Sequence, residues 1–443
     1  MYRNNHMILP KSSGDTFVRQ YGNKKRQATR LCLLAIILLL IAISGLSCKG
    51  KESEVTYEHV VTLHPGYSIT EEGVLYTDSK AYARQCYFDF ATLRNVYFCS
   101  KPNCDHTSLD CTARAVRDWH FIVDEDRYYL ESQTEMDDNK QQIMRTYLYQ
   151  SDMSNTRTKA VAWIDGALLS DQYLLGNQLY LLAREFEIKD GVNTSYASFC
   201  LNIVDLKTFS VERIPIRDGH FLDMIPCGIS NHKLILYYRY YDNEIDARDY
   251  GMTDSFENFM KDEVNFQKYM QAVMEVFHEG MSCFDLNSLQ LEELDLPIPL
   301  LVSGEYYYYN KHKPDNSNEL IVYSFTTKQE EVLMPTPAYS VSEVGDTLFI
   351  LEGYEGISDI TGQPHIRRDT AGRKYAYDII TKGMKELEGA LPEDAQLRMI
   401  GEYKEFYIFL YTNIKEGISQ RIGYILKEDY LNGKMDYIIV DPI

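Results

Sequence analysis

The chain alternates short runs of aromatic and aliphatic residues with polar turns, and two kinds of run recur in a fixed order. The first kind is a short strand that follows a polar turn, as in EEGVLYTD (71–78) and SGEYYYYN (303–310). The second kind is a strand, a turn that carries Asp, Ser or Thr, and another alternating strand, as in CYFDFATLRNVYFC (86–99). Alternation with period two around such turns predicts β-hairpins.

This pair of runs occurs seven times along the chain. The first runs occupy 71–78, 124–132, 175–183, 230–241, 303–310, 344–353 and 401–412, and the second runs occupy 86–99, 147–163, 200–216, 282–296, 321–334, 375–388 and 423–440. Antiparallel units of three or four strands that repeat without helices between them are typical of a β-propeller. Two sandwiches in tandem, the alternative, would not need the same motif in every unit. The sequence therefore predicts an all-β fold, a β-propeller with seven blades over residues 67–443.

One inserted amphipathic helix interrupts the repeat. The residues expected at the hairpin turns are Asp89, Asp152, Asp205, Asp285, Ser324, Asp378 and Asp429, and the widest gap between them places an insertion at about 242–280. Within it, residues 254–279 carry apolar side chains at spacings of three, four and seven, which predicts a helix from Asp254 to Gly280. An apolar stripe on a helix usually faces a core. The stripe therefore favours a helix that packs on its own blade over a lid or a helix that binds a partner.

The ends of the chain are expected to close the propeller. The run VTYEHVVTL (55–63) precedes the first unit and has the composition of a strand. Because propellers often complete the last blade with an N-terminal strand, we expect this run to pair beside MDYIIV (435–440). Residues 48–66 would then serve as a tether that ends in the closing strand.

The first 47 residues have the features of a secretory signal. A basic region that includes Arg26 and Arg30 precedes the uncharged run LCLLAIILLLIAISGLS, which ends directly at Cys48. The order SGLSC resembles the lipobox of bacterial lipoproteins, which implies cleavage before Cys48 and lipidation of its thiol. An uncleaved N-terminal anchor is the alternative. In either case, the remaining chain is expected outside the cytoplasm and attached to the membrane of the cell surface or envelope.

Composition narrows the class of partner. The net charge of the chain is −20, and no basic stripe interrupts its acidic character. Such a surface repels nucleic acid, so nucleic-acid binding is excluded. The expected partners are the membrane, through the lipid, and an unknown protein or glycan ligand.

The stretch CSKPNCDHTSLDC (99–111) contains the candidate metal-binding residues. Cys99, Cys104, His106 and Cys111 supply three thiolates and one imidazole, which is a ligand set of structural zinc sites. Disulfides are the alternative, because cysteines outside the cytoplasm are often paired and Cys86 provides a fourth thiol. Seven cysteines remain after Cys32 and Cys48 are set aside, and an odd number of cysteines cannot all form disulfides. The chain therefore tolerates at least one free thiol, which favours a metal site over disulfides in this cluster.

The same stretch carries a family resemblance. Tyr87, Asp89, Cys99, Ser100, Lys101, Pro102, Cys104, His106 and Cys111 match a strand, a Tyr-x-Asp turn and a Cys-Ser-Lys-Pro-x-Cys-x-His segment closed by a third cysteine. This pattern resembles the first blade of uncharacterised β-propeller lipoproteins of anaerobic gut bacteria, the low-density-lipoprotein-receptor-like propellers. The resemblance implies a propeller on the cell surface and no known activity.

No catalytic residues can be assigned from the sequence. It has no G-x-S-x-G, H-E-x-x-H or Walker-type motif, and its ten histidines are dispersed. Acidic turns at 124–126 and 135–138 could hold calcium, but they are expected to be solvated hairpin turns. The sequence thus favours a non-enzymatic binding protein; the alternatives are a carbohydrate-active hydrolase or lyase on the propeller, and a structural or sensory subunit of an envelope complex.

Overall fold

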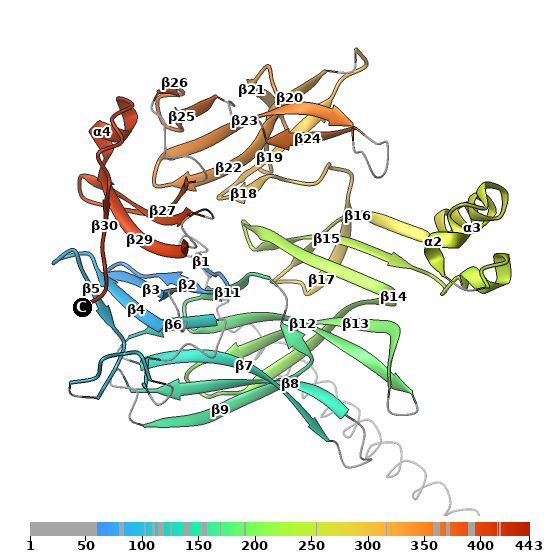
Figure 1. The fold of residues 1–443 in the computed structure, drawn as a ribbon, viewed down its shortest axis with the longest axis horizontal. Coiled ribbons are helices and arrows are strands. Elements are labelled where there is room, and N and C mark those ends of the chain that lie inside the picture. Colours follow the sequence, from blue (N-terminus) through green and yellow to red (C-terminus); the bar gives the residue numbers. More distant parts are fainter. Residues whose placement is uncertain are drawn as a thin grey trace, which may run out of the picture. The chain divides into compact units, whose positions relative to one another are not determined.

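The regular structure is almost entirely antiparallel β-sheet (Figure 1). In this computed structural model the described residues are 60–443 without 79–83, 102, 109–110, 114–118, 125, 137–141, 153–156, 169, 190–191, 254, 316, 358–363, 369–372, 389–394, 414 and 416–417. Cys48 and the predicted signal segment lie outside these residues. Among the described residues, no helix has the length and apolar character that a membrane span requires.

Five of the six sheets contain four or five strands. They are β2-β3-β4-β5 (Tyr67–Ile69, Gly73–Asp78, Arg84–Asp89, Arg94–Tyr97); β6-β7-β8-β9 (Trp119–Val123, Asp126–Met136, Gln142–Ser151, Thr158–Asp165); β18-β19-β20-β21 (Leu301–Ser303, Tyr306–His312, Asn318–Ser324, Glu330–Met334); β22-β23-β25-β26 (Ala338–Val344, Thr347–Ile357, Lys374–Asp378, Met384–Leu387), with β24 (Pro364–Arg368) beside β23; and β27-β28-β29-β30 (Ala395–Tyr403, Phe406–Asn413, Ile418–Leu426, Ile438–Ile439).

The remaining sheet has nine strands. Its order is β1-β11-β12-β13-β14-β15-β16-β17 (Val60–Leu63, Gln172–Leu175, Gln178–Lys189, Val192–Asp205, Val211–Ser230, Lys233–Tyr241, Phe277–Asp285, Gln290–Leu294), with β10 (Ala167–Leu168) beside β12. The 20-residue strand β14 pairs through its first half with β13 and through its second half with β15. Division of this sheet at β14 would give seven blades, whereas hydrogen bonding alone gives six sheets. The number of seven blades therefore stays a prediction.

From the second sheet onward, each sheet packs face to face against the next one along the chain, and the first sheet meets the second through a hydrogen bond from Arg127 of β7 to Gln85 of β4. Leu130 of β7 and Leu181 of β12 share one buried cluster, and further clusters join each later sheet to its successor. The first and last sheets also meet, through Phe88 of β4 and Ile408 of β28, both fully buried. Sheets that pack in sequence and return to the first define a β-propeller, as predicted.

The hairpin turns share one local structure that explains the repeat in the sequence. Four aspartates, Asp89, Asp205, Asp285 and Asp378, accept a hydrogen bond at Oδ1 from the backbone N–H three residues later, at 2.7–2.9 Å. The residue four positions after each of them has a positive φ of 52–58°. A short side chain that binds its own backbone stabilises such a turn, which is why aspartate recurs there. Asp429 was predicted to be a seventh turn residue, but it lies in helix α4 (Lys427–Leu431).

The predicted closing strand was wrong. Val60–Leu63 forms β1, which pairs with β11, and β30 pairs with β29. The chain instead closes where its C-terminal residues reach β5: Ile443 N donates to Asn95 O at 2.9 Å, and Asn95 Nδ2 donates to Val440 O at 2.9 Å. Leu63 is fully buried in the cluster that includes Trp119 and Leu174, so apolar burial fixes β1 beside β11.

The insertion between β15 and β16 differs from the single predicted helix. It contains a 3-10 helix η2 (Ala247–Tyr250) and two α-helices, α2 (Phe256–Phe259) and α3 (Glu263–Glu275). Asp262 caps α3 through a hydrogen bond from Asn265 N, and Gly280 lies inside β16. In Figure 1 the two helices lie at the ends of β15 and β16, and their aromatic side chains pack on each other, not on a blade.

Candidate metal centre

The structure brings the four predicted ligands together. One ligand atom from each of Cys99, Cys104, His106 and Cys111 lies within 4.8 Å of the others. They lie on the loop between β5 and β6, which joins the first sheet to the second. Among the described residues, no other group of three or more His, Cys, Asp or Glu side chains converges in this way.

Two of the distances between these atoms match those of a tetrahedral zinc ion, and the others extend up to 4.8 Å. Bonds of about 2.3 Å to sulfur and about 2.0 Å to nitrogen place two sulfurs about 3.8 Å apart and a sulfur and a nitrogen about 3.5 Å apart. Cys99 Sγ and Cys111 Sγ are 3.8 Å apart, and His106 Nδ1 is 3.4 Å from Cys111 Sγ. The residues present could therefore hold a metal, with four protein ligands and no position left open.

Side chains outside the ligand set hold the loop in place. Arg84 is buried beneath it and donates from Nε to His106 O at 2.6 Å and from Nη2 to Ser108 O at 2.9 Å. Thr112 Oγ1 donates to Cys99 Sγ at 3.3 Å, and the Tyr97 ring stacks on His106 at 4.2 Å. Such partners orient metal ligands and raise affinity. Sequence reasoning missed Arg84, because its contact with the loop appears only when β4 lies under it.

The electrostatics of the site favour the metal-binding form at Cys99 and at His106, but the protonated form at Cys111. Partial burial raises the pKa of Cys99, but hydrogen bonds from Thr112, the Lys101 backbone and the neighbouring thiols outweigh it and lower the pKa to about 7. Burial and the positive charge of Arg84 lower the pKa of His106, which favours the neutral imidazole. Burial raises the pKa of Cys111 to about 11, so this thiol would release its proton to solvent only when a metal binds.

Cys86 does not join the cluster. It is fully buried on β4, where its thiol points to the carbonyl of Arg84, and burial raises its pKa. Each of the seven described cysteines is a free thiol. The structure thus gives no support to a pair of disulfides that includes Cys86.

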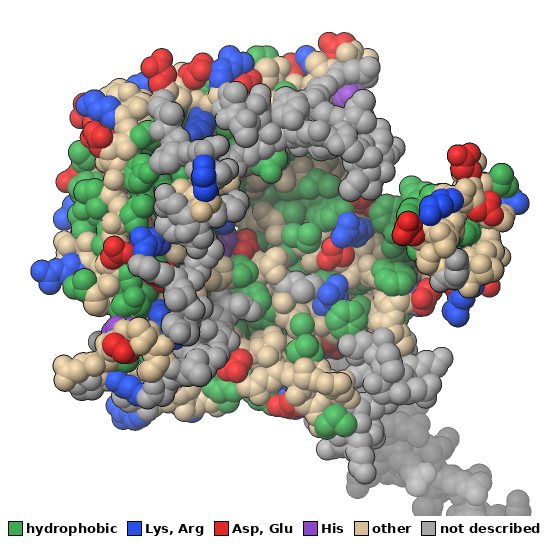
Figure 2. All heavy atoms as spheres, in the orientation of Figure 1, with side chains coloured by type: hydrophobic (Ala, Val, Ile, Leu, Met, Phe, Trp, Pro, Cys, Tyr) green, Lys and Arg blue, Asp and Glu red, His purple; other side chains and the backbone are tan. Residues whose placement is uncertain are grey.

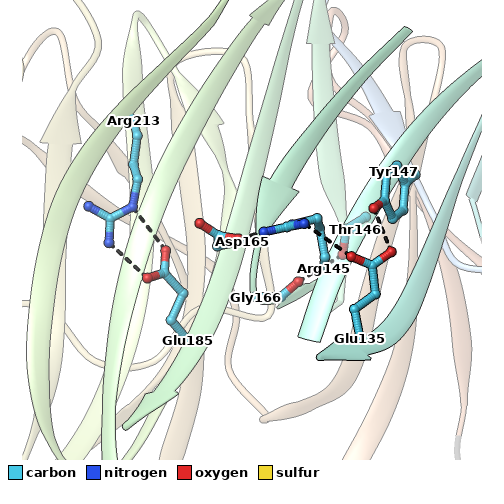
Figure 3. Close-up of polar contacts among 8 residues, drawn as sticks. All are labelled: Glu135, Arg145, Thr146, Tyr147, Asp165, Gly166, Glu185 and Arg213. Atoms are coloured by element: carbon cyan, nitrogen blue, oxygen red, sulfur yellow. Dashed lines mark hydrogen bonds and ion pairs between the residues drawn. The ribbon is translucent and has the colours of Figure 1, made fainter. Parts of the chain in front are cut away.

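Glu135 and Asp126, two carboxylates of the acidic turns considered for calcium, have partners on neighbouring strands. Glu135 accepts hydrogen bonds from Arg145 Nη1 at 3.0 Å and from Tyr147 OH at 2.5 Å, while Arg145 Nε donates to Asp165 at 3.3 Å (Figure 3). Asp126 accepts from Gln150 at 2.6 Å. These carboxylates stabilise β7, β8 and β9, as expected for hairpin residues.

Comparison with known proteins adds only distant similarities. No family model matches the chain, and no curated protein does. Among solved structures, it is similar to an uncharacterised protein of Listeria monocytogenes (13% identity, 70% of this chain and 83% of that one, TM-score 0.38). It is also similar to an oligogalacturonate lyase in complex with manganese, with 11% identity over 84% of this chain and 92% of that one and a TM-score of 0.40. A third similar structure is a prolyl endopeptidase, with 9% identity over 87% of this chain and 50% of that one and a TM-score of 0.48. At this level of similarity, no activity or residue role is transferred to this chain.

Proposed function

We propose that this chain is a non-enzymatic, lipid-anchored β-propeller that binds a protein partner outside the cytoplasm, and that its Cys3His cluster holds a structural zinc ion. The zinc would stabilise the loop between two sheets, since a site with four protein ligands has no position for substrate. The partner would bind the insertion of residues 242–276, here called the helical insertion.

The observation that carries this proposal is the exposed apolar surface of the helical insertion. Its aromatic residues form a small core of their own, in which Phe259 is buried and Phe266 and Tyr269 pack against it. Other apolar side chains stay at the surface: Met260 is 46% exposed, Val264 64%, Met270 38% and Met274 60%. Figure 2 shows hydrophobic side chains on this part of the surface beside charged ones.

Methionine-rich surfaces are common where proteins bind partners, because the side chain is apolar and adaptable. No residue of α3 is fully buried, and its exposed side chains Val264, Met270 and Met274 are available to a second protein. The cost of exposing them to water is offset when a partner covers them.

A site-specific photo-crosslinker at Met274 is expected to give a discrete protein adduct in cells that produce the full chain. The same probe at Lys207, on an exposed hairpin turn, is the control. Substitution of Met260, Val264 and Met270 by glutamine should abolish the Met274 adduct without lowering the melting temperature, because these side chains lie outside the insertion's core. Absence of an adduct, or equal adducts at both positions, would contradict the proposal.

Replacement of Cys48 by serine is expected to release the protein from lipid modification. We expect either secretion or an uncleaved precursor, seen as a change in mass and in the membrane fraction. The thiol is the group that carries the lipid in the proposed processing, and acyl chains hold proteins on membranes by burying CH₂ groups. Unchanged processing of the Cys48→Ser chain would count against a lipoprotein.

One observation favours the enzymatic alternative, a carbohydrate-active hydrolase or lyase. A cavity of about 770 Å³ between the β2–β3 turn and β6 is lined by the carboxylates Glu71, Glu72 and Asp124. Paired carboxylates perform glycoside hydrolysis. Release of reducing sugar from a polysaccharide panel, lost on Glu72→Gln, would favour the enzyme over the binding protein.

A further inference from the structure

The contact between the first and second sheets differs from the other contacts between successive sheets of this propeller. Each of those other contacts contains a cluster of buried apolar side chains. Among the described residues, no such cluster joins the sheet of β2–β5 to the sheet of β6–β9. Polar side chains lie there instead, and we call this contact the polar seam.

Strand alternation identifies the side chains that face the polar seam. Cys86 of β4 packs in the cluster toward the last sheet, so its neighbour Gln85 points to the second sheet. In the same way, Tyr128 of β7 packs toward the nine-stranded sheet, so Arg127 points to the first sheet. A hydrogen bond from Arg127 Nη2 to Gln85 Oε1 connects the two faces. The polar residues buried there to 2% exposure or less are Ser68, Gln85, His120 and Arg127.

The polar seam is held less firmly than a contact made by apolar burial. Ser68 Oγ and Gln85 Nε2 are buried and, in the described part of the chain, have no hydrogen-bond partner. Such atoms destabilise the closed arrangement, because water would satisfy them when the two sheets separate. Ile122, the cross-strand partner of Arg127, also lines the cavity of about 770 Å³, so packing beside the hydrogen bond is incomplete. We therefore expect the propeller to open first at the polar seam.

Gln85 joins the polar seam to the loop that carries the Cys3His cluster. Its backbone N–H donates to Ala113 O at 2.6 Å, and its carbonyl accepts a hydrogen bond from Phe98 N at 2.9 Å. Phe98 and Ala113 lie just outside the first and the last ligand of the cluster. The guanidinium of Arg127 lies over the Phe98 ring at 4.5 Å. Both ends of the loop and the second sheet thus meet at Gln85.

A metal in the cluster would hold the two ends of this loop together. Cys99 Sγ and Cys111 Sγ are 3.8 Å apart, and zinc would bond both of them at about 2.3 Å. Each of the described cysteines is a free thiol, so the metal would supply the bonds that join the two ends. Loss of the metal would let these ends move apart and weaken their hydrogen bonds to Gln85.

We propose that the Cys3His loop is a metal-dependent latch, which keeps the first sheet against the second through Gln85 when zinc is bound. Loss of zinc would open the polar seam and widen the cavity that Ile122 borders. The metal would therefore control the access of a ligand to this cavity. The latch depends on the zinc ion of the proposed function and gives that ion a regulating role beside its stabilising one.

Hydroxyl-radical footprinting of the full-length protein, with and without zinc, tests the latch. Tyr129 reports on the polar seam, because it is 1% exposed and lies on the same face of β7 as Arg127. Phe121, also 1% exposed, faces the opposite way from the same sheet and is the internal control. When a chelator removes zinc under reducing conditions, we expect oxidation of Tyr129 to rise at least about threefold and that of Phe121 to stay unchanged.

Two variants separate the latch from a general loss of stability. Gln85→Ala removes the acceptor of Arg127 but no zinc ligand. It should raise the oxidation of Tyr129 at least about threefold, while zinc stays at about one ion per chain. Ile408→Ala is the matched control, since it weakens the apolar contact between the first and last sheets. With zinc bound, this control should leave Tyr129 as protected as in the wild type.

The possible failures of the latch and of the zinc site are distinguishable. Protein that binds zinc, but in which removal of the metal leaves Tyr129 protected, would overturn the latch and keep the zinc site. Equal rises at Tyr129 and Phe121 would also overturn the latch, because they would show general unfolding. Wild-type protein purified without zinc would overturn both the latch and the zinc site.

Discussion

Replacing Cys104 by serine is expected to reduce bound zinc from about one ion per chain to none and to lower the free energy of unfolding by about 4 kcal/mol. The four ligands lie within 4.8 Å of one another and leave no open position, so loss of one thiolate removes a quarter of the coordination shell. The three remaining ligands would be left close together without the ion that neutralises them. Metal analysis and thermal unfolding of protein purified under reducing conditions measure both effects.

The control for this prediction is Cys227→Ser. Cys227 is a free, half-buried thiol outside the cluster, and its Sγ donates to Ile225 O at 3.5 Å. Its replacement should leave the zinc content unchanged and cost less than about 1 kcal/mol, because a hydroxyl can keep this hydrogen bond. Wild-type protein without zinc, together with loss of free thiols on oxidation, would show that the cluster forms disulfides.

Substitution of Asn95 by leucine is expected to lower the free energy of unfolding by about 3 kcal/mol and to open the contact between the first sheet and the C-terminus. The buried Asn95 amide donates to Tyr76 OH at 2.6 Å and to Val440 O at 2.9 Å. Leucine would leave these two acceptors without their donor. Faster hydrogen exchange in β5 and β30 than in the other strands would locate the opening.

Asn202→Leu provides a matched control for Asn95→Leu. Asn202 is equally buried, but in the described part of the chain its Nδ2 donates no hydrogen bond. Leucine at position 202 removes an amide but breaks no hydrogen bond of its Nδ2. We therefore expect a smaller loss in the free energy of unfolding than for Asn95→Leu. Equal losses in the two variants would show that Asn95 has no special role in closure.

The two predictions concern adjacent parts of the structure. Tyr97 of β5 stacks on His106 of the loop between β5 and β6, and the backbone N–H of Tyr97 donates to Ile443 O at 3.4 Å. Effects at contacting sites are generally not additive. The Cys104→Ser and Asn95→Leu changes combined should therefore cost a different amount from the sum of the single changes.

The repeat could be predicted because its signals are local. Asp205 fixes its turn through backbone groups two and three residues away, so the letters themselves indicate the hairpin. The Cys3His cluster was found for the same reason, since its four residues lie within thirteen consecutive residues. Arg84, which supports them from β4, could not be found, because its role depends on where two segments lie in space.

Consecutive tyrosines show where alternation alone misleads. In the run 306–310, alternation with period two would by itself place every second ring on the same face of the strand. The structure buries Tyr307, Tyr308 and Tyr309 almost completely, because β19 is an inner strand with a sheet packed on each face. These rings are therefore core residues.

The sequence by itself determined the turns at Asp89, Asp205, Asp285 and Asp378 and the cysteine and histidine set, because each is set by residues close in the chain. The propeller class could be predicted because these local signals recur along the chain. Only the tertiary structure decided that β1 pairs with β11 and that the C-terminus meets β5. It also decided that the helical insertion packs on itself. Apolar burial has no preferred direction, so which surfaces meet depends on every other sheet being in place.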